Sequence, residues 1–205
     1  MKAMGSPWVL AALLGGTVVL SGGALNAADS HAAALAAFDT IQTVLQHPRC
    51  QNCHIPGDAP LVFDAGATHP QNVQRGPSGN GAPGLPCTTC HGTKNPPASY
   101  GANVPPGAPA WRLPAPDRKM VFIGLSKADL CATIKDPKRN GNRNLAALLE
   151  HVSHDQLVLW GWDPGVGRAP VSIPHDAFVA SFKTWIAGGA PCPAVGEGAK
   201  TARLK

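Results

Sequence analysis

Hydrophobic residues recur at helical spacing in four segments of the chain. The first segment runs from about Ala32 to Gln46, where Asp29 or Ser30 can cap the helix and His47-Pro48 ends it. Its large apolar residues fall mainly on one side: Leu35, Phe38, Ile41, Val44 and Leu45. This pattern predicts a helix that leads into the sequence Cys50 to His54.

Three more helices are expected in the second half of the chain. Ser126 and Asp129 resemble a capping box, which predicts a helix that Pro137 ends. The next helix starts near Asn142 or Asn144 and carries an apolar stripe of Leu145, Leu148, Leu149 and Val152. The last helix covers residues 175–187 and ends at two glycines, with an inward face of Phe178, Phe182, Trp185 and Ile186.

Residues 57–86 and 95–116 show no period and are rich in Gly, Pro and Asn, which predicts loops. No strand pattern of any length is present. The whole chain has 23 glycines and 21 prolines but only 11 aromatic residues, so we expect sparse regular structure and a thin apolar core. The predicted fold class is therefore mainly α and loop-rich.

Two short motifs dominate the chemistry of the chain. Cys50-Gln51-Asn52-Cys53-His54 and Cys87-Thr88-Thr89-Cys90-His91 both have the pattern C-x-x-C-H, which attaches c-type haem. Two thiols at this spacing form thioethers with the two vinyl groups of one porphyrin, and the next residue places an imidazole on the iron. The motifs predict two haem c groups with His54 and His91 as proximal ligands.

A four-cysteine zinc site is the main alternative for the same cysteines. The 33 residues between Cys53 and Cys87 exceed the usual spacing of such a site, and zinc leaves both motif histidines unexplained. Two plain disulfides leave the histidines unexplained as well. Haem is therefore the preferred interpretation.

Residues 1–28 resemble an export signal, with one charge at Lys2 and an apolar run from Trp8 to Leu20. A domain of residues 29–205 would remain after cleavage, in the periplasm. An uncleaved membrane anchor is the alternative, but four glycines and the short apolar core favour cleavage. No later segment is long and apolar enough to span a membrane.

The two remaining cysteines are Cys131 and Cys192. An exported protein can form disulfides, so the simplest hypothesis is that these two pair. Such a bridge would close a loop of about 60 residues and stabilise the fold by about 4 kcal/mol. Two unpaired buried thiols are the alternative.

The formal charge of +5 includes Lys2 of the signal, and the basic residues are scattered. This charge suggests weak attraction to an acidic redox partner. A solvated tail that carries Lys200, Arg203 and Lys205 is the alternative, and the sequence favours it. No basic stripe is interleaved with aromatic residues, so we expect no nucleic-acid partner.

The ligand on the opposite face of each iron decides what a haem can do. Met120 is the only methionine outside the signal, so at most one haem can have His/Met ligation. The histidines outside the motifs are His31, His47, His69, His151, His154 and His175. Arg75 and Arg168 are candidates to bind haem propionates, and Trp111, Trp160 and Trp162 are candidates to pack on the porphyrins.

The chain resembles small periplasmic dihaem cytochromes of the family described as isoquinoline 1-oxidoreductase subunits, which are partners of molybdenum hydroxylases. The resemblance covers residues 47–193. It rests on both motifs with their flanks and on further short runs: His47-Pro48-Arg49, His69, Val73-Gln74-Arg75-Gly76, Gly84-Leu85-Pro86, Met120, Leu130-Cys131, Lys135-Asp136-Pro137, Arg139-Asn140-Gly141, His151, residues 157–162, Pro164-Gly165, Arg168, Trp185 and Cys192-Pro193.

This resemblance implies a cytochrome c-like dihaem domain and a dehydrogenase or molybdenum hydroxylase as redox partner. Matching the runs, it implies His69 as one distal ligand and Met120 or His151 as the other, with His154 in reserve. The expected function is one-electron transfer from a dehydrogenase towards a respiratory chain, without catalytic residues. The alternatives are a small peroxidase-like dihaem enzyme with one open iron, and a structural or sensing subunit of a larger enzyme.

Overall fold

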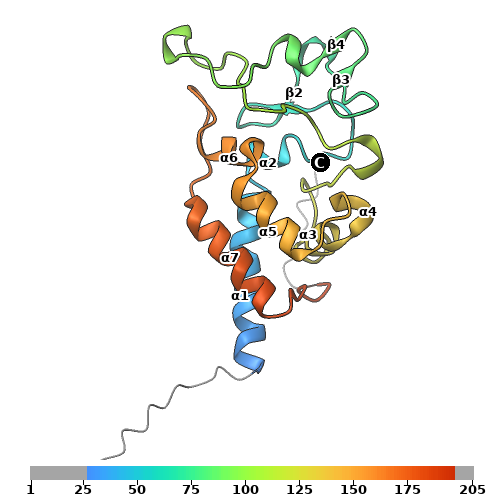
Figure 1. Cartoon of the computed structure of the whole chain (residues 1–205), viewed down its shortest axis with the longest axis vertical. Helices are drawn as coiled ribbons and strands as arrows, with labels where there is room; N and C mark the ends of the chain where they lie inside the picture. Colours follow the sequence, from blue (N-terminus) through green and yellow to red (C-terminus); the bar gives the residue numbers. More distant parts are fainter. Residues whose placement is uncertain (1–26, 197–205) are drawn as a thin grey trace, which may run out of the picture.

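The computed structural model describes residues 27–196, which form a helical half and a loop-rich half (Figure 1). The α-helices are α1 (Ala27–Leu45), α2 (Pro48–Gln51), α3 (Lys127–Lys135), α4 (Pro137–Asn140), α5 (Leu145–His154), α6 (Gln156–Leu159) and α7 (His175–Ala187). Short 3₁₀ turns are η1 (Pro70–Asn72), η2 (Cys87–Thr89), η3 (Ala98–Tyr100), η4 (Pro116–Arg118) and η5 (Trp160–Trp162). The fold class is confirmed at this level: the described chain is mainly helical and rich in loops.

The four predicted helices are confirmed as α1, α3, α5 and α7. The Ser126 capping box forms, since the backbone N–H of Asp129 donates to Ser126 Oγ and this hydroxyl donates to Asp129 Oδ2. Asn144 caps α5 by accepting from the N–H of Ala147. The start of α1 differs from the prediction: the helix begins at Ala27, so Asp29 and Ser30 lie inside its first turns.

The apolar core lies where α1 packs against α7, with α3 and α5 beside them (Figure 1). Trp185 is fully buried at its centre, with its ring centroid 5.4 Å from that of Phe38 and 5.7 Å from that of Phe182. The predicted disulfide between Cys131 and Cys192 is present and joins α3 to the segment after α7. This half therefore has its own core of helical side chains.

The expectation that no strands occur is wrong in detail. The loop-rich half contains two antiparallel pairs, β1 (Leu61–Val62) with β2 (Ala67–Thr68) and β3 (Gly81–Ala82) with β4 (Leu85–Pro86). Each strand has only two residues, which is too short for an alternating apolar pattern to show in the sequence.

Arg75 holds the loop-rich half together from inside. Its side chain is 1% exposed and donates to the carbonyl oxygens of Ile55, Gly57 and Pro114, as well as to the carboxylate of Asp58. These bonds tie the segment after the first cysteine motif to the segment near residue 114. Because its donors are bound to protein groups, Arg75 is a structural residue here, and the propionate role predicted from sequence is not supported.

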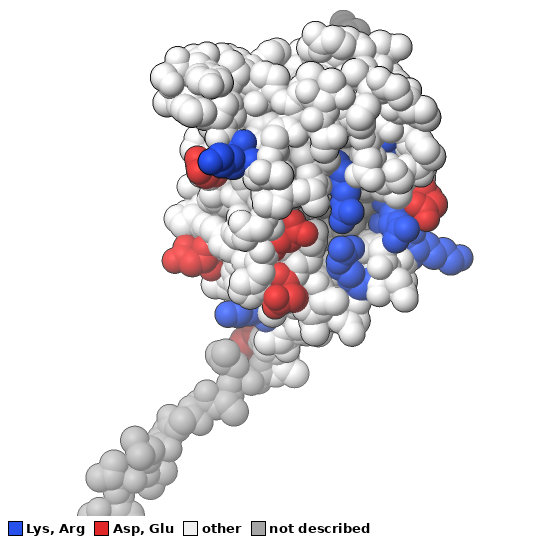
Figure 2. All heavy atoms as spheres, turned by 45° about the horizontal axis from the view of Figure 1, so that its top comes forward, with Lys and Arg blue, Asp and Glu red and all other residues white. Residues whose placement is uncertain are grey.

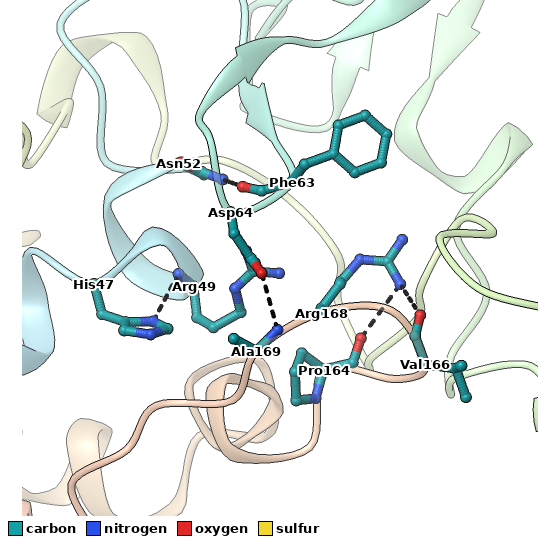
Figure 3. Close-up of polar contacts among 9 residues, drawn as sticks. All are labelled: His47, Arg49, Asn52, Phe63, Asp64, Pro164, Val166, Arg168 and Ala169. Atoms are coloured by element: carbon teal, nitrogen blue, oxygen red, sulfur yellow. Dashed lines mark hydrogen bonds and ion pairs between the residues drawn. The ribbon is translucent and has the colours of Figure 1, made fainter.

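A second set of polar contacts joins the two halves beside α2 (Figure 3). Asp64 accepts from the guanidinium of buried Arg49 at 2.5 Å and from the backbone N–H of Ala169 at 3.2 Å. Arg168 donates to the carbonyl oxygens of Val104, Pro164 and Val166. Arg168 therefore fixes these loops, and its predicted role at a haem propionate stays a prediction.

Within residues 27–196 no helix is both long enough and apolar enough to cross a membrane. The predicted export signal lies outside the described residues, except for Ala27 and Ala28 at the start of α1.

Candidate haem-binding sites

The first site consists of Cys50, Cys53 and His54, and α2 places it at the junction of the two halves. His47 caps α2 and Pro48 starts it, so the turn that carries Cys50 has a fixed beginning. The backbone N–H groups of Cys53 and His54 both donate to the carbonyl of Cys50, which continues this turn through the motif. All three side chains line a cavity of about 350 Å³.

The imidazole of His54 is held on two sides by the segment from Met120 to Phe122. Its Nδ1–H donates to the Met120 carbonyl at 2.6 Å, and its ring stacks on Phe122 with centroids 3.9 Å apart and planes 10° apart. Burial lowers the pKa of His54 to about 4, so the ring is neutral near pH 7. Because a carbonyl only accepts, the proton sits on Nδ1 and the Nε2 lone pair remains for a metal.

His151 lines the same cavity from α5. Its Nδ1–H donates to Asp155 Oδ2 at 3.2 Å, and the other oxygen of this carboxylate caps α6 through the N–H of Leu157. Burial lowers the pKa of His151, and Asp155 opposes this shift. His151 also lies close enough to act on the pKa of His54. The structure thus brings a second imidazole to the cavity of the first site.

Met120 also lines the cavity of the first site. Its carbonyl accepts the hydrogen bond from Nδ1 of His54, and its side chain packs against the helical core. The Nδ1 atom of His151 is held by Asp155, as that of His54 is held by the Met120 carbonyl. This shared arrangement is the observation that favours His151 over Met120 as the second ligand.

The second site consists of Cys87, Cys90 and His91 in the loop-rich half. Cys87 starts η2, and its carbonyl accepts from the N–H groups of Cys90 and His91, as in the first motif. His91 Nδ1–H donates to the Pro106 carbonyl at 2.8 Å. The ring stacks on Trp111 with centroids 4.4 Å apart and planes 9° apart. Both motif histidines are therefore held in the same way: a backbone carbonyl accepts from Nδ1, and an aromatic ring stacks on the imidazole.

His69 lies next to the second site. Its ring centroid is 6.1 Å from that of His91, and its Nδ1–H donates to the carbonyl of Pro70. A metal ion bound between two imidazoles at about 2 Å from each nitrogen would place the ring centroids roughly 6 Å apart. The spacing of His69 and His91 thus fits one iron between them.

The other histidines are engaged differently. His47 Nδ1 accepts from the N–H of Arg49, and His175 Nε2 donates to the Val152 carbonyl. His154 is largely exposed beside Glu150 and lines a separate groove, and His31 is exposed on α1. None of these four lines the cavity of the first site.

The thiols of the first site are neutral. Burial raises the pKa of Cys50 to about 12 and that of Cys53 to about 11. Cys53 and Cys87 are close enough for their charges to interact, so the two sites adjoin. Among residues 27–196 no group of three or more His, Cys, Asp or Glu side chains is placed so that it could hold a metal ion.

Two tryptophans connect the sites. Trp111 stacks on His91 and also lines the cavity of the first site. The ring of Trp160 meets Trp111 edge to face at 4.9 Å, and its Nε1–H donates to Asn95 Oδ1. Asn95 in turn accepts from Gly107 N–H and donates to the Asp163 carbonyl, which fixes the loop around His91.

Sequence reasoning missed three groups at these sites. The His-x-x-x-Asp spacing of His151 and Asp155 is a helical i, i+4 pair, and this signal was present in the sequence. The carbonyls of Met120 and Pro106 had no sequence signal, because every residue has a backbone carbonyl.

No protein-family model, curated protein or solved structure matches this chain.

Proposed function

We propose that this chain is a periplasmic electron-transfer protein with a cytochrome c-like domain that binds two haem c groups covalently. The single observation that carries the proposal is a hydrogen bond that four histidines have in common. Two of them belong to the C-x-x-C-H motifs, and the other two are the candidate distal ligands. His54, His91, His69 and His151 each use Nδ1 in a hydrogen bond, which leaves Nε2 free to bind iron.

The residues present fit this cofactor. Cys50 and Cys53 would hold one haem and Cys87 and Cys90 the other. His54 with His151, and His91 with His69, would supply the axial nitrogens. Each haem, when bound, supplies an iron that accepts and releases one electron.

The protein's own contribution is to fix ligands and limit water access. The carbonyls of Met120 and Pro106 and the carboxylate of Asp155 hold the imidazole rings in one tautomer. Phe122 and Trp111 cover the faces of the two motif histidines. Ligands fixed in this way need little rearrangement when the charge of the iron changes, which is what fast electron transfer requires.

The surroundings of the two sites differ, which supports a directional relay. The first site is lined by core residues such as Phe178 and Phe182, whereas Cys90 of the second site is exposed. The second haem would therefore present its edge to solvent and to a redox partner. A dehydrogenase of the molybdenum hydroxylase type is the partner that the family resemblance implies.

Haem stoichiometry and ligation test this function. The chain is expressed with haem-maturation machinery, and its mass and optical spectra are measured in the oxidised, reduced and carbon monoxide-treated states. We expect two covalent haems with low-spin spectra that carbon monoxide leaves unchanged. A chain without covalent haem would contradict the proposal, and a large shift with carbon monoxide would favour an enzyme with an open iron.

A further inference from the structure

A cluster of arginines lines the cavity of the first site. Beyond Arg49, which is paired with Asp64, the cavity wall includes the guanidinium-bearing residues Arg112, Arg118, Arg139 and Arg143. Among residues 27–196, Asp155 is the only carboxylate that lines the same cavity. In Figure 2, basic side chains gather on one side of the visible face. The cavity wall therefore has a surplus of positive charge.

Two of these arginines converge at Gly141, which ends α4 with a left-handed φ of 74°. A Cβ at this glycine would lie 2.9 Å from Arg143 Nη1 and 3.9 Å from Arg118 Nη1. The two guanidinium groups thus lie near one another. Arg118 has only an exposed contact with the adjacent Asp117, which is a weak interaction.

Arg143 is held in place by its neighbour Asn140. The buried side-chain amide of Asn140 accepts from the Arg143 N–H at 2.8 Å and donates to the Arg143 carbonyl at 2.9 Å. Arg143 Nη1 also donates to the Asn140 carbonyl. These hydrogen bonds with Asn140 fix the position of Arg143 in the turn after α4, and no side-chain carboxylate takes part in them.

Arg118 and Arg143 line the same cavity as the two cysteines but come from other segments of the chain. Arg118 ends η4 and Arg143 follows α4, whereas Cys50 lies in α2 and Cys53 comes two residues after this helix. The vinyl groups and the propionates of a haem are on opposite edges of the porphyrin. A haem fixed at Cys50 and Cys53 by its vinyl edge therefore directs its two carboxylates away from these thiols.

We propose that Arg118 and Arg143 form the binding site for the propionates of the haem attached to Cys50 and Cys53. Guanidinium groups bind carboxylates through two parallel hydrogen bonds, and two adjacent guanidiniums match two propionates. This inference rests on the proposed haem function. It assigns to Arg118 and Arg143 the role that the sequence suggested for Arg75 and Arg168.

Redox titration of the loaded protein tests this site. The variants are Arg118→Gln, Arg143→Gln and Arg143→Lys, and the control is Lys138→Gln, an exposed α4 residue that does not line the cavity. At the potential where the wild-type haem is half reduced, each Gln variant should lower the reduced-to-oxidised ratio up to about fivefold. Arg143→Lys should retain most of the wild-type ratio, and Lys138→Gln should leave it unchanged.

The change should affect only the haem whose spectrum responds to His151→Ala, since that defines the first site. Unchanged ratios in both Gln variants would overturn the propionate site. So would a structure of the loaded protein in which neither arginine lies within hydrogen-bond distance of a propionate. Mass spectrometry distinguishes failure of this proposal from failure of the proposed function. If the chain carries two haems but the redox ratios of the Gln variants are unchanged, only the arginine site is contradicted. If the chain carries no covalent haem, the proposed function itself is contradicted.

Discussion

The rings of His69 and His91 lie 6.1 Å apart although 21 residues separate them in the chain. The hydrogen bonds of both Nδ1 atoms leave their Nε2 atoms available to one iron. His69→Ala should therefore leave the second haem with one axial histidine. We expect a partly high-spin spectrum and binding of carbon monoxide to one of the two haems.

His154→Ala is the matched control, because His154 is exposed and lies away from the cavity. It should leave the spectrum unchanged. A low-spin, carbon monoxide-resistant spectrum in His69→Ala would show that another residue binds the second iron.

At the first site, His151 and Met120 both line the cavity, and we propose His151 as the distal ligand. His151→Ala should open the first haem to carbon monoxide. Met120→Ala should keep the low-spin spectrum, because the Met120 carbonyl that holds His54 remains. The near-infrared band of Met-ligated ferric haem should be absent from the wild-type protein, and its presence would restore Met120 as ligand.

Asp155 lines the cavity of the first site and pairs with Nδ1 of His151. The change Asp155→Asn keeps an acceptor for the α6 cap but removes the negative charge beside Nδ1 of His151. A less electron-rich imidazole stabilises ferric iron less, so the potential of the first haem should rise. Asp155→Ala should also lower the free energy of unfolding by about 1 kcal/mol through loss of the cap. Redox titration and urea unfolding measure the two effects, and equal potentials in wild type and Asp155→Asn would contradict the role of the charge.

The helices of this protein could be predicted because their signals are local. Ser126 and Asn144 cap helices at the positions that the sequence indicates. The apolar stripe of α7 is buried in the core, as Trp185 and Phe182 show. The loops of the other half were predicted as loops, but their arrangement in space could not be, because Arg75 and Asn95 fix it through carbonyl groups distant in the chain. Such bonds leave no periodic trace in a sequence.

The site was predictable to a similar extent. Covalent chemistry at C-x-x-C-H requires fixed spacing, so all six motif residues are evident from the sequence. The residues that hold the rings are not, because Pro106 and Met120 act through their backbones. Spacing also says nothing about which arginines line the cavity, so Arg118 and Arg143 could not be singled out from the sequence.

The disulfide between Cys131 and Cys192 stabilises the helical half independently of haem. It bridges a sequence separation of 61 residues between α3 and the segment that follows α7. The double variant Cys131→Ala/Cys192→Ala should lose about 4 kcal/mol of unfolding free energy, measured in urea, while the haem spectra stay unchanged. Altered haem spectra would show that the bridge supports the cofactor sites as well.

Removal of haem should affect the two halves unequally. The core around Phe38, Phe178 and Trp185 consists of helical side chains packed on one another, so these helices have apolar contacts of their own. The loop-rich half has few buried apolar residues and depends on polar bonds around Arg75. A chain with Ser at the four motif cysteines should retain helical circular dichroism, but amide hydrogens of residues 57–115 should exchange much faster than in the loaded protein. Equal protection in both forms would mean that the loops fold without haem, and loss of the helical signal would mean that the core also requires it.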